Sequence, residues 1–306
     1  MKNAKKLVLA ALLFVSCTKV PTINLTEHQF NQTPERMVIV QIPGLTEEAF
    51  SPLKYRGPEA TKKVATEFFA CFGKMWKFNQ FEMNPKVEDS LVSQISGYPR
   101  SEKTCEKYQD PRVWDVLSDI GFSTAVYQRG NDKFLDEALS CNPKLFYKTR
   151  LFTSPQKSKK GNLEAFHFEK MKAYLSGVVY QDESCSNGKC FATVKDNFDH
   201  IWKSMSQTTK KLVVIRDFDL TLKGADSAQY IENLNRFLFY LVHDFSIANP
   251  QTSIIVTGVS KGADLSPVWA NGPLAENFCG QFNEYEMFKR FFWKSQKSTI
   301  PLIDGI

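Results

Sequence analysis

Two carboxylates and a glycine-rich turn stand where chemistry could be carried out, each directly after an apolar run. Asp217 and Asp219 follow the run 212–215, and the turn 258–262, "GVSKG", follows the run 254–257. Closely spaced carboxylates can hold a hard cation such as magnesium or calcium, while hydroxyl and ammonium groups can bind an anion. The candidate chemistry therefore lies at the ends of apolar runs.

These apolar runs are predicted to be buried strands. The run 37–42, "MVIVQI", ends at Pro43-Gly44 and has the same character as 212–215 and 254–257. Strands that alternate with helices predict an α/β sheet covered on both faces, with ligands bound outside the carboxyl ends of the strands. The helical patterns are Trp114, Leu117 and Ile120 before a stop at Gly121, and Ile231, Leu234, Phe237, Leu238 and Leu241 after a cap at Asp226 or Ser227.

Residues 1–16 have the pattern of a signal peptide. Three lysines precede the apolar run 7–15, which is too short to span a bilayer. The end of the run, "FVSC", resembles the lipobox of bacterial lipoproteins and implies a lipid anchor on Cys17, although Phe14 replaces the usual leucine. An ordinary signal peptide with Cys17 as a spare thiol is the alternative. Because Thr18 is not the aspartate that often retains lipoproteins in the inner membrane, we expect an outer-membrane anchor facing the periplasm or the cell surface.

The remaining cysteines also favour export. Apart from Cys17 they are even in number, as expected of a chain that forms disulfides in an oxidising compartment. Cys185 and Cys190 flank Asn187-Gly188, the favoured pair of a tight hairpin turn, so they are predicted to form a disulfide. A metal site is the rival interpretation, but no histidine lies near. The sequence leaves open the pairing of Cys71, Cys105, Cys141 and Cys279.

Composition and charge exclude several classes of protein. A chain of 306 residues that is 42% hydrophobic can bury a globular core, and it shows no internal repeat. The formal net charge of +6 includes the three lysines of the leader, so the rest carries about +3 and gives no argument for nucleic acid. The polar stretch 153–162 is predicted to be an exposed loop. Any anion site must therefore be local.

Five segments, taken in order, resemble the alkaline phosphatase and sulfatase superfamily. They fall in three regions, 37–50, 87–127 and 212–293, and each motif is degenerate. The resemblance implies a three-layer αβα sandwich with a mostly parallel central sheet, formed by residues 17–306 as a single domain. The stretch at about 135–207 has no match and is expected to be an insertion over the site. The segments are "MVIVQIPGLTEEAF", "EDSLVSQISGYP", "VLSDIGFSTAVY", "VIRDFDLTLKG" and the stretch from Thr252 to Phe292.

The resemblance also implies that most metal ligands have been replaced. Enzymes of this superfamily hold two divalent ions with aspartates and histidines, yet Pro43 stands where the first aspartate is expected. Asp219 is kept, but Lys223 replaces the histidine of its Asp-x-x-x-His element. Val259 and Ser260 replace a further Asp-His pair. The nucleophile position falls on Ser90, preceded by Asp89.

Two binding sites remain open at these positions. An oxygen-only site for magnesium or calcium could use Asp89, Asp217 and Asp219, because hard cations need only carboxylates and carbonyls. The four histidines lie away from the strand ends, which argues against a zinc pair. Alternatively, Lys223 and Lys261, with the hydroxyls of Ser90 and Ser260, could bind the phosphate or sulfate group of a ligand. The alternative to an anion site is that these lysines are ordinary surface residues that point to solvent.

Two other patterns are weaker. "DFDLT", 217–221, is similar to the Asp-x-Asp-x-Thr of haloacid-dehalogenase phosphatases, but there the motif normally opens the fold. The aromatic cluster Phe288, Phe291, Phe292 and Trp293 has helical spacing and is predicted to be core.

The sequence as a whole therefore predicts an exported, lipid-anchored protein with an alkaline-phosphatase-like fold that has lost its catalytic ions. On this interpretation it is a pseudoenzyme without a cofactor, which binds an anionic ligand or a protein partner. The alternative is a hydrolase of phosphate or sulfate esters that uses Ser90 as nucleophile together with zinc, magnesium or calcium.

Overall fold

The computed structural model describes residues 34–55, 64–77, 86–98, 105–154, 168–174, 177–182, 184–186, 189–190, 192–222, 227–259 and 265–292. The predicted signal peptide and Cys17 lie outside these residues, as do Lys223, Ser260 and Lys261. In the described part of the chain, no helix is both long and apolar enough to cross a membrane.

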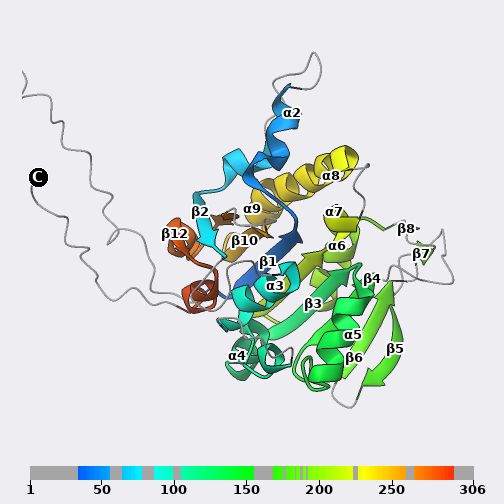
Figure 1. Ribbon diagram of the computed structural model, residues 1–306. Coiled ribbons are helices and arrows are strands. Elements are labelled where there is room, and N and C mark those ends of the chain that lie inside the picture. The colour runs from blue at the N-terminus through cyan, green and yellow to red at the C-terminus, as the bar shows by residue number, and fades with distance from the viewer. Residues whose placement is uncertain are drawn as a thin grey trace, which may run out of the picture. The chain divides into compact units, whose positions relative to one another are not determined.

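A large mixed sheet forms the centre of the molecule (Figure 1). Its order is β12-β2-β11-β10-β1-β9-β3-β4-β6-β5, and the central strands from β10 to β6 run parallel. Antiparallel pairs occur only toward the edges, at β10–β11, β11–β2 and β5–β6. The strands are β1 (Arg36–Pro43), β2 (Cys71–Trp76), β3 (Ser123–Arg129), β4 (Arg150–Ser154), β5 (Phe168–Tyr174), β6 (Gly177–Asp182), β9 (Lys211–Asp217), β10 (Thr252–Val259), β11 (Ser266–Asn271) and β12 (Gly280–Asn283).

Each central strand contributes side chains to two hydrophobic cores, one on each face of the sheet. In β9, Leu212 and Val214 belong to one core, and Val213 and Ile215 belong to the other. Successive side chains of a strand point to opposite faces, so a strand covered on both faces needs an unbroken apolar run. This is the physical reason for the three runs seen in the sequence.

Helices cover both faces and complete three layers. On the first face lie α3 (Val87–Ser96), α4 (Val113–Asp119) and α5 (Asp132–Cys141), which Figure 1 shows in front of the sheet. On the second face lie α6 (Val194–Ser204) and α8 (Ser227–Tyr240), followed by the π-helical turn η5 (Leu241–Phe245). The short elements are η1 (Glu47–Phe50), α2 (Ser51–Tyr55), η2 (Ala65–Phe68), η3 (Glu106–Tyr108), α7 (Asp219–Leu222), α9 (Ser246–Ala248), η6 (Ala275–Phe278), η7 (Glu284–Glu286) and α10 (Met287–Arg290).

The predicted fold class and elements are confirmed. The three predicted strands are β1, β9 and β10, each extending one or two residues beyond its apolar run at either end. The helix predicted to stop at Gly121 is α4, and Gly121 adopts a positive φ that suits glycine. Phe288, Phe291 and Phe292 pack in the first core, as predicted, while Trp293 lies outside the described residues.

The described parts of 135–207 join the domain in two ways. β4, β6 and β5 extend the sheet at one edge, and α6 packs on the second face. Between them the small hairpin β7 (Cys185–Ser186) and β8 (Lys189–Cys190) leads to the start of α6. This stretch therefore supplies sheet and core as well as surface above the strand ends.

The six cysteines from Cys71 onward form three disulfides. Cys185 pairs with Cys190 across the hairpin, as predicted. The pairings that the sequence left open are Cys71–Cys279, which joins β2 to the chain before β12, and Cys105–Cys141, which joins η3 to the end of α5. The first of these joins cysteines 208 residues apart in the sequence and so closes a long loop of the chain.

Candidate functional site

The carboxyl ends of β1 and β10 are held together by backbone contacts. Pro43 lies opposite Val259 in the register, and the Gly44 amide donates to the Val259 carbonyl at 2.8 Å. A Cβ at Gly258 would lie 2.2 Å from the Leu45 carbonyl oxygen, so only glycine fits this close approach. Val259, which stands where a metal ligand was expected, is buried in the first core.

The retained aspartate of β9 is paired with an arginine. Nη2 of Arg129, at the end of β3, lies 2.8 Å from Oδ2 of Asp219. The side chains are only 16% and 9% exposed, so the pair is shielded from water. Burial alone would lower the pKa of Arg129, but the nearby charges, Asp217 first among them, raise it overall. The guanidinium is a permanent cation at this carboxylate.

The second carboxylate, Asp217, is also satisfied within the protein. Its Oδ2 accepts a hydrogen bond from the Tyr230 hydroxyl of α8 at 3.0 Å, and its Oδ1 accepts one from the Asp219 amide at 3.1 Å. Burial raises the pKa of Asp217, opposed by the charge of Arg129. Burial and then the Asp217 charge raise the pKa of Tyr230 well above its ordinary value, so its hydroxyl stays a donor.

A pocket of about 410 Å³ opens beside these residues. Its floor includes Asp217, Asp219, Arg129 and Tyr230, and its other walls come from α8 and from the chain leading into α6. The size suits a small ligand. The remaining lining residues are Cys190, Ala192, Thr193, Val194, Lys195, Gln229, Asn233, Leu234, Arg236 and Phe237.

Ser90 lies on the other face of the sheet, in the first turn of α3. It is 0% exposed, and its amide donates to the Lys86 carbonyl. Its neighbour Asp89 forms an ion pair of 2.6 Å with Lys107, which also approaches Glu137. Asp217 points to the second face, so Asp89, Asp217 and Asp219 are not brought together: among the described residues they form no group of clustered ligand atoms.

A buried polar network fixes α3 on the sheet. Nε2 of Gln41 donates to the Leu91 carbonyl and to Oε1 of Gln94, which also accepts from the Thr257 hydroxyl. Nε2 of Gln94 donates to Oε1 of the buried Glu284. Two amide side chains, Gln41 and Gln94, therefore occupy the space between α3 and the strand ends, and none of the sequence motifs had pointed to them.

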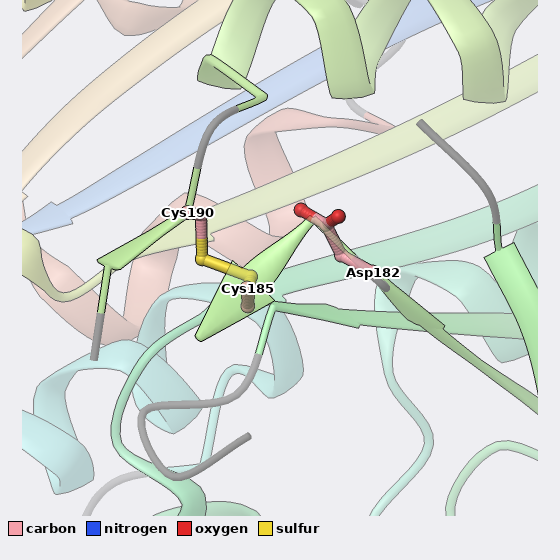
Figure 2. A group of neighbouring side chains, drawn as sticks. All are labelled: Asp182, Cys185 and Cys190. Atoms are coloured by element: carbon pink, nitrogen blue, oxygen red, sulfur yellow. A yellow bond between two sulfur atoms is a disulfide. The ribbon is translucent and has the colours of Figure 1, made fainter. Parts of the chain in front are cut away.

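One cluster of potential metal ligands is found in the described part of the chain, formed by Asp182, Cys185 and Cys190 (Figure 2). The two sulfur atoms are bonded to each other, which removes both thiolates as ligands. Asp182 accepts hydrogen bonds from the Ser154 hydroxyl, the Asn197 amide group and the Ser184 backbone amide. In this disulfide form the cluster anchors the hairpin.

Arg129 is a candidate site residue that the sequence interpretation missed. Lys223 was expected to replace the lost cation, but it lies outside the described residues, as do Ser260 and Lys261. A signal was present in the sequence: Arg129 ends the segment 123–129 directly before Gly130, as a residue at a strand end would. The parallel pairing of β3 with β9, which places it beside Asp217, could not be read from the sequence.

The sequence matches no protein-family model and no curated protein, whereas the fold matches solved structures. Against the alkaline phosphatase of the Antarctic bacterium TAB5 the TM-score is 0.64 at 12% identity, over 85% of this chain and 98% of that one. Against the alkaline phosphatase of Shewanella sp. the TM-score is 0.57 at 10% sequence identity, over 83% of this chain and 98% of that one. Against a protein in the alkaline phosphatase superfamily from Vibrio parahaemolyticus the TM-score is 0.52 at 10% sequence identity, over 85% of this chain and 66% of that one. At these identities the likeness shows an alkaline-phosphatase-like fold.

The described residues do not fit a pair of catalytic metal ions. Pro43 and Val259 have no side-chain ligand atom, and Asp219 already has a guanidinium at 2.8 Å. A dication placed there would have to separate the Arg129 guanidinium from Asp219 inside the protein, and breaking a buried pair is costly. The donor set favours a permanent internal cation over a bound one.

Proposed function

We propose that this chain is an exported protein that uses an alkaline-phosphatase-like fold to bind a phosphate- or sulfate-bearing ligand without hydrolysing it. The observation that carries the proposal is the Arg129–Asp219 pair, in which an arginine stands at the aspartate that the resemblance assigns to a metal ion. An arginine cannot activate a nucleophile as a metal ion does, but it can hold an anion.

The pocket supports ligand binding at this edge of the sheet. Three of its lining side chains are cationic (Arg129, Lys195 and Arg236) and two are carboxylates. Lys195 and Arg236 reach carboxylates of their own helices, Asp199 and Glu232, so the remaining N–H groups of Arg129 and the residues Lys223 and Lys261 are the anion donors that we propose.

Export is proposed from the leader pattern and from the disulfides. All six cysteines after Cys17 are paired, as suits an oxidising compartment. We propose a lipid anchor on Cys17 in the outer membrane, facing the periplasm or the cell surface.

Calorimetric titration of the purified domain with inorganic phosphate and inorganic sulfate tests the binding proposal. We expect saturable binding of at least one, weakened about tenfold or more by Lys223→Met with Lys261→Met, because a charge-assisted hydrogen bond contributes about 1.5–3 kcal/mol. The matched control is the exposed Lys144→Met, which should bind like the wild type. Unchanged affinity in the double variant, or no binding by the wild type, would refute the anion site.

The alternative, a divergent ester hydrolase with Ser90 as nucleophile, has one observation in its favour. Ser90 lies in the first turn of α3, next to the strand ends, where a nucleophile of this fold would stand. Its complete burial and the pairing of Asp89 with Lys107 count against it.

A further inference from the structure

Arg216 is a cation built into the first face of the sheet. It lies one residue before the end of β9, opposite Gln41 of β1 and Gln128 of β3 in the register. Because in-register residues of parallel strands share a face, the three side chains form a polar row beneath the helices of the first layer. Such a row interrupts an otherwise apolar core.

The guanidinium of Arg216 has little to compensate its charge. The residue is 3% exposed, and its one hydrogen bond among the described residues is from Nε to Oε1 of Gln41, at 3.1 Å. It forms no ion pair with any carboxylate in the described part of the chain. The rings of Trp114 and Phe134 lie 5.3 and 5.8 Å from it. A buried cation without a counter-ion is costly, so the Nη groups call for an acceptor.

Two buried atoms near this residue lack hydrogen-bond partners in the described part of the chain. The hydroxyl of Tyr108 and Oε1 of Gln128 have no hydrogen-bond partner among the described residues. Nε2 of Gln128 donates to the carbonyls of Gly130 and Asn131, which fixes the direction of that amide. Buried polar atoms are nearly always satisfied, so the unpartnered hydroxyl of Tyr108 near an uncompensated guanidinium indicates a missing acceptor. Oε1 of Gln128 is itself an acceptor and would be satisfied by a donor such as water.

Tyr108 is a donor at this place and not the counter-ion. Burial raises its pKa to about 12, although the charges of Lys107 and Arg216 act to lower it. At neutral pH the phenol is therefore neutral. Its ring packs against Phe134, one of the two rings that flank Arg216.

We propose that Arg216 and Tyr108 hold a buried monovalent anion of the size of chloride, which completes the core between α3, α4 and α5. The Nη groups of Arg216 and the phenolic O–H supply the donors, and the anion supplies the missing negative charge. A tetrahedral oxyanion would need more donors than these. The site is separate from the proposed ligand pocket, because Arg216 and Asp217 point to opposite faces of β9.

Crystals grown in sodium bromide test the proposal directly, since bromide scatters anomalously and water does not. We expect an anomalous peak within about 3.5 Å of an Arg216 Nη atom and of the Tyr108 hydroxyl oxygen. Ordinary water density there without an anomalous signal would overturn the proposal, because water alone would then satisfy these atoms. Bromide only at the surface would overturn it equally.

Stability in solution gives a second test. Chloride is added in place of gluconate, so that the ionic strength stays constant. The folded-to-unfolded ratio of the wild type should then rise about tenfold for each tenfold rise in chloride concentration above the dissociation constant of chloride. Arg216→Met and the milder Tyr108→Phe should each lose most of this dependence, while the exposed Arg150→Met should keep it. An equal chloride dependence in wild type and Tyr108→Phe would contradict the assignment of the phenol. A wild type that does not respond would contradict the site. The ligand-binding proposal survives either result, since its test uses other residues.

Discussion

Two consecutive residues of β9 carry opposite charges and face opposite sides of the sheet. Asp217 points to the second face, where Tyr230 donates to it and Arg129 lies beside it. Arg216 points to the first face, where only the neutral Gln41 contacts it through a hydrogen bond. One charge is thus compensated by the protein, and the other, within the described residues, is not.

The comparison shows two ways in which charged groups at the strand ends are accommodated within the described residues. On the second face the guanidinium of Arg129 pairs with Asp219, and the neutral phenol of Tyr230 donates a hydrogen bond to Asp217. On the first face amide side chains join α3 to the strand ends and leave a guanidinium in excess. We therefore expect the free energy of unfolding to fall when the partners of the second face are removed. On the first face we expect it to depend on the concentration of an external anion.

The largest effect is expected from Arg129→Met. This change leaves buried carboxylates without their cation, so the free energy of unfolding should fall by about 3–5 kcal/mol. Urea denaturation with the disulfides intact measures it, and Arg150→Met should stay within about 0.5 kcal/mol of the wild type. If Arg129→Met cost less than about 1 kcal/mol, the pair would not be the internal substitute for a metal ion.

The next effect is expected from Tyr230→Phe. The variant keeps the ring but removes the donor to a buried carboxylate, which should cost about 2 kcal/mol. Tyr147→Phe, at an exposed tyrosine, is the matched control and should change nothing measurable. Equal stability of both variants would show that Asp217 finds another donor, and the contrast between the two faces would weaken.

Arg216→Met should give a smaller effect in a chloride-free buffer. Loss of the Gln41 hydrogen bond destabilises the native state, while removal of a buried unpaired charge stabilises it, so we expect a change within about 1 kcal/mol. The comparison with Arg129→Met is made in the same urea series. A loss as large as that of Arg129→Met would mean that Arg216 has an internal partner, and the two faces would be alike.

The smallest expected effect is a difference between the pKa values of two buried tyrosines, Tyr108 and Tyr230. Absorbance titration of their phenols measures it. Tyr108 lies beside a cation and should ionise near its raised pKa of about 12, whereas Tyr230 lies beside an anion and should ionise later. Difference spectra of Tyr108→Phe and Tyr230→Phe assign the two steps. Since the folded pKa is raised, the contribution of Tyr108 to stability is full below pH about 10 and is lost as the pH rises through about 12. The reverse order of ionisation would contradict the assigned charges.

The sequence predicted the layers better than it predicted the site. The runs at β1, β9 and β10 revealed the buried strands, because a strand covered on both faces must be apolar throughout. The Cys185–Cys190 hairpin could be predicted because its turn residues are local.

The site depends on contacts between distant segments. Arg129 and Asp219 are ninety residues apart and meet only because β3 pairs with β9, and Gln94 reaches Glu284 over 190 residues. The resemblance directed attention to the lysines at the expected histidine positions. It gave no signal for an arginine arriving from a neighbouring strand, nor for the disulfides that join distant cysteines.

Whether the protein binds anionic groups without hydrolysing their esters is tested most directly with aryl phosphate and aryl sulfate esters. Hydrolysis by the purified domain is measured with zinc, magnesium, manganese and calcium in turn. We expect no metal-dependent turnover above that of Ser90→Ala, together with binding of phosphate or sulfate by both proteins. Metal-dependent turnover that Ser90→Ala abolishes would contradict it and would identify a working hydrolase.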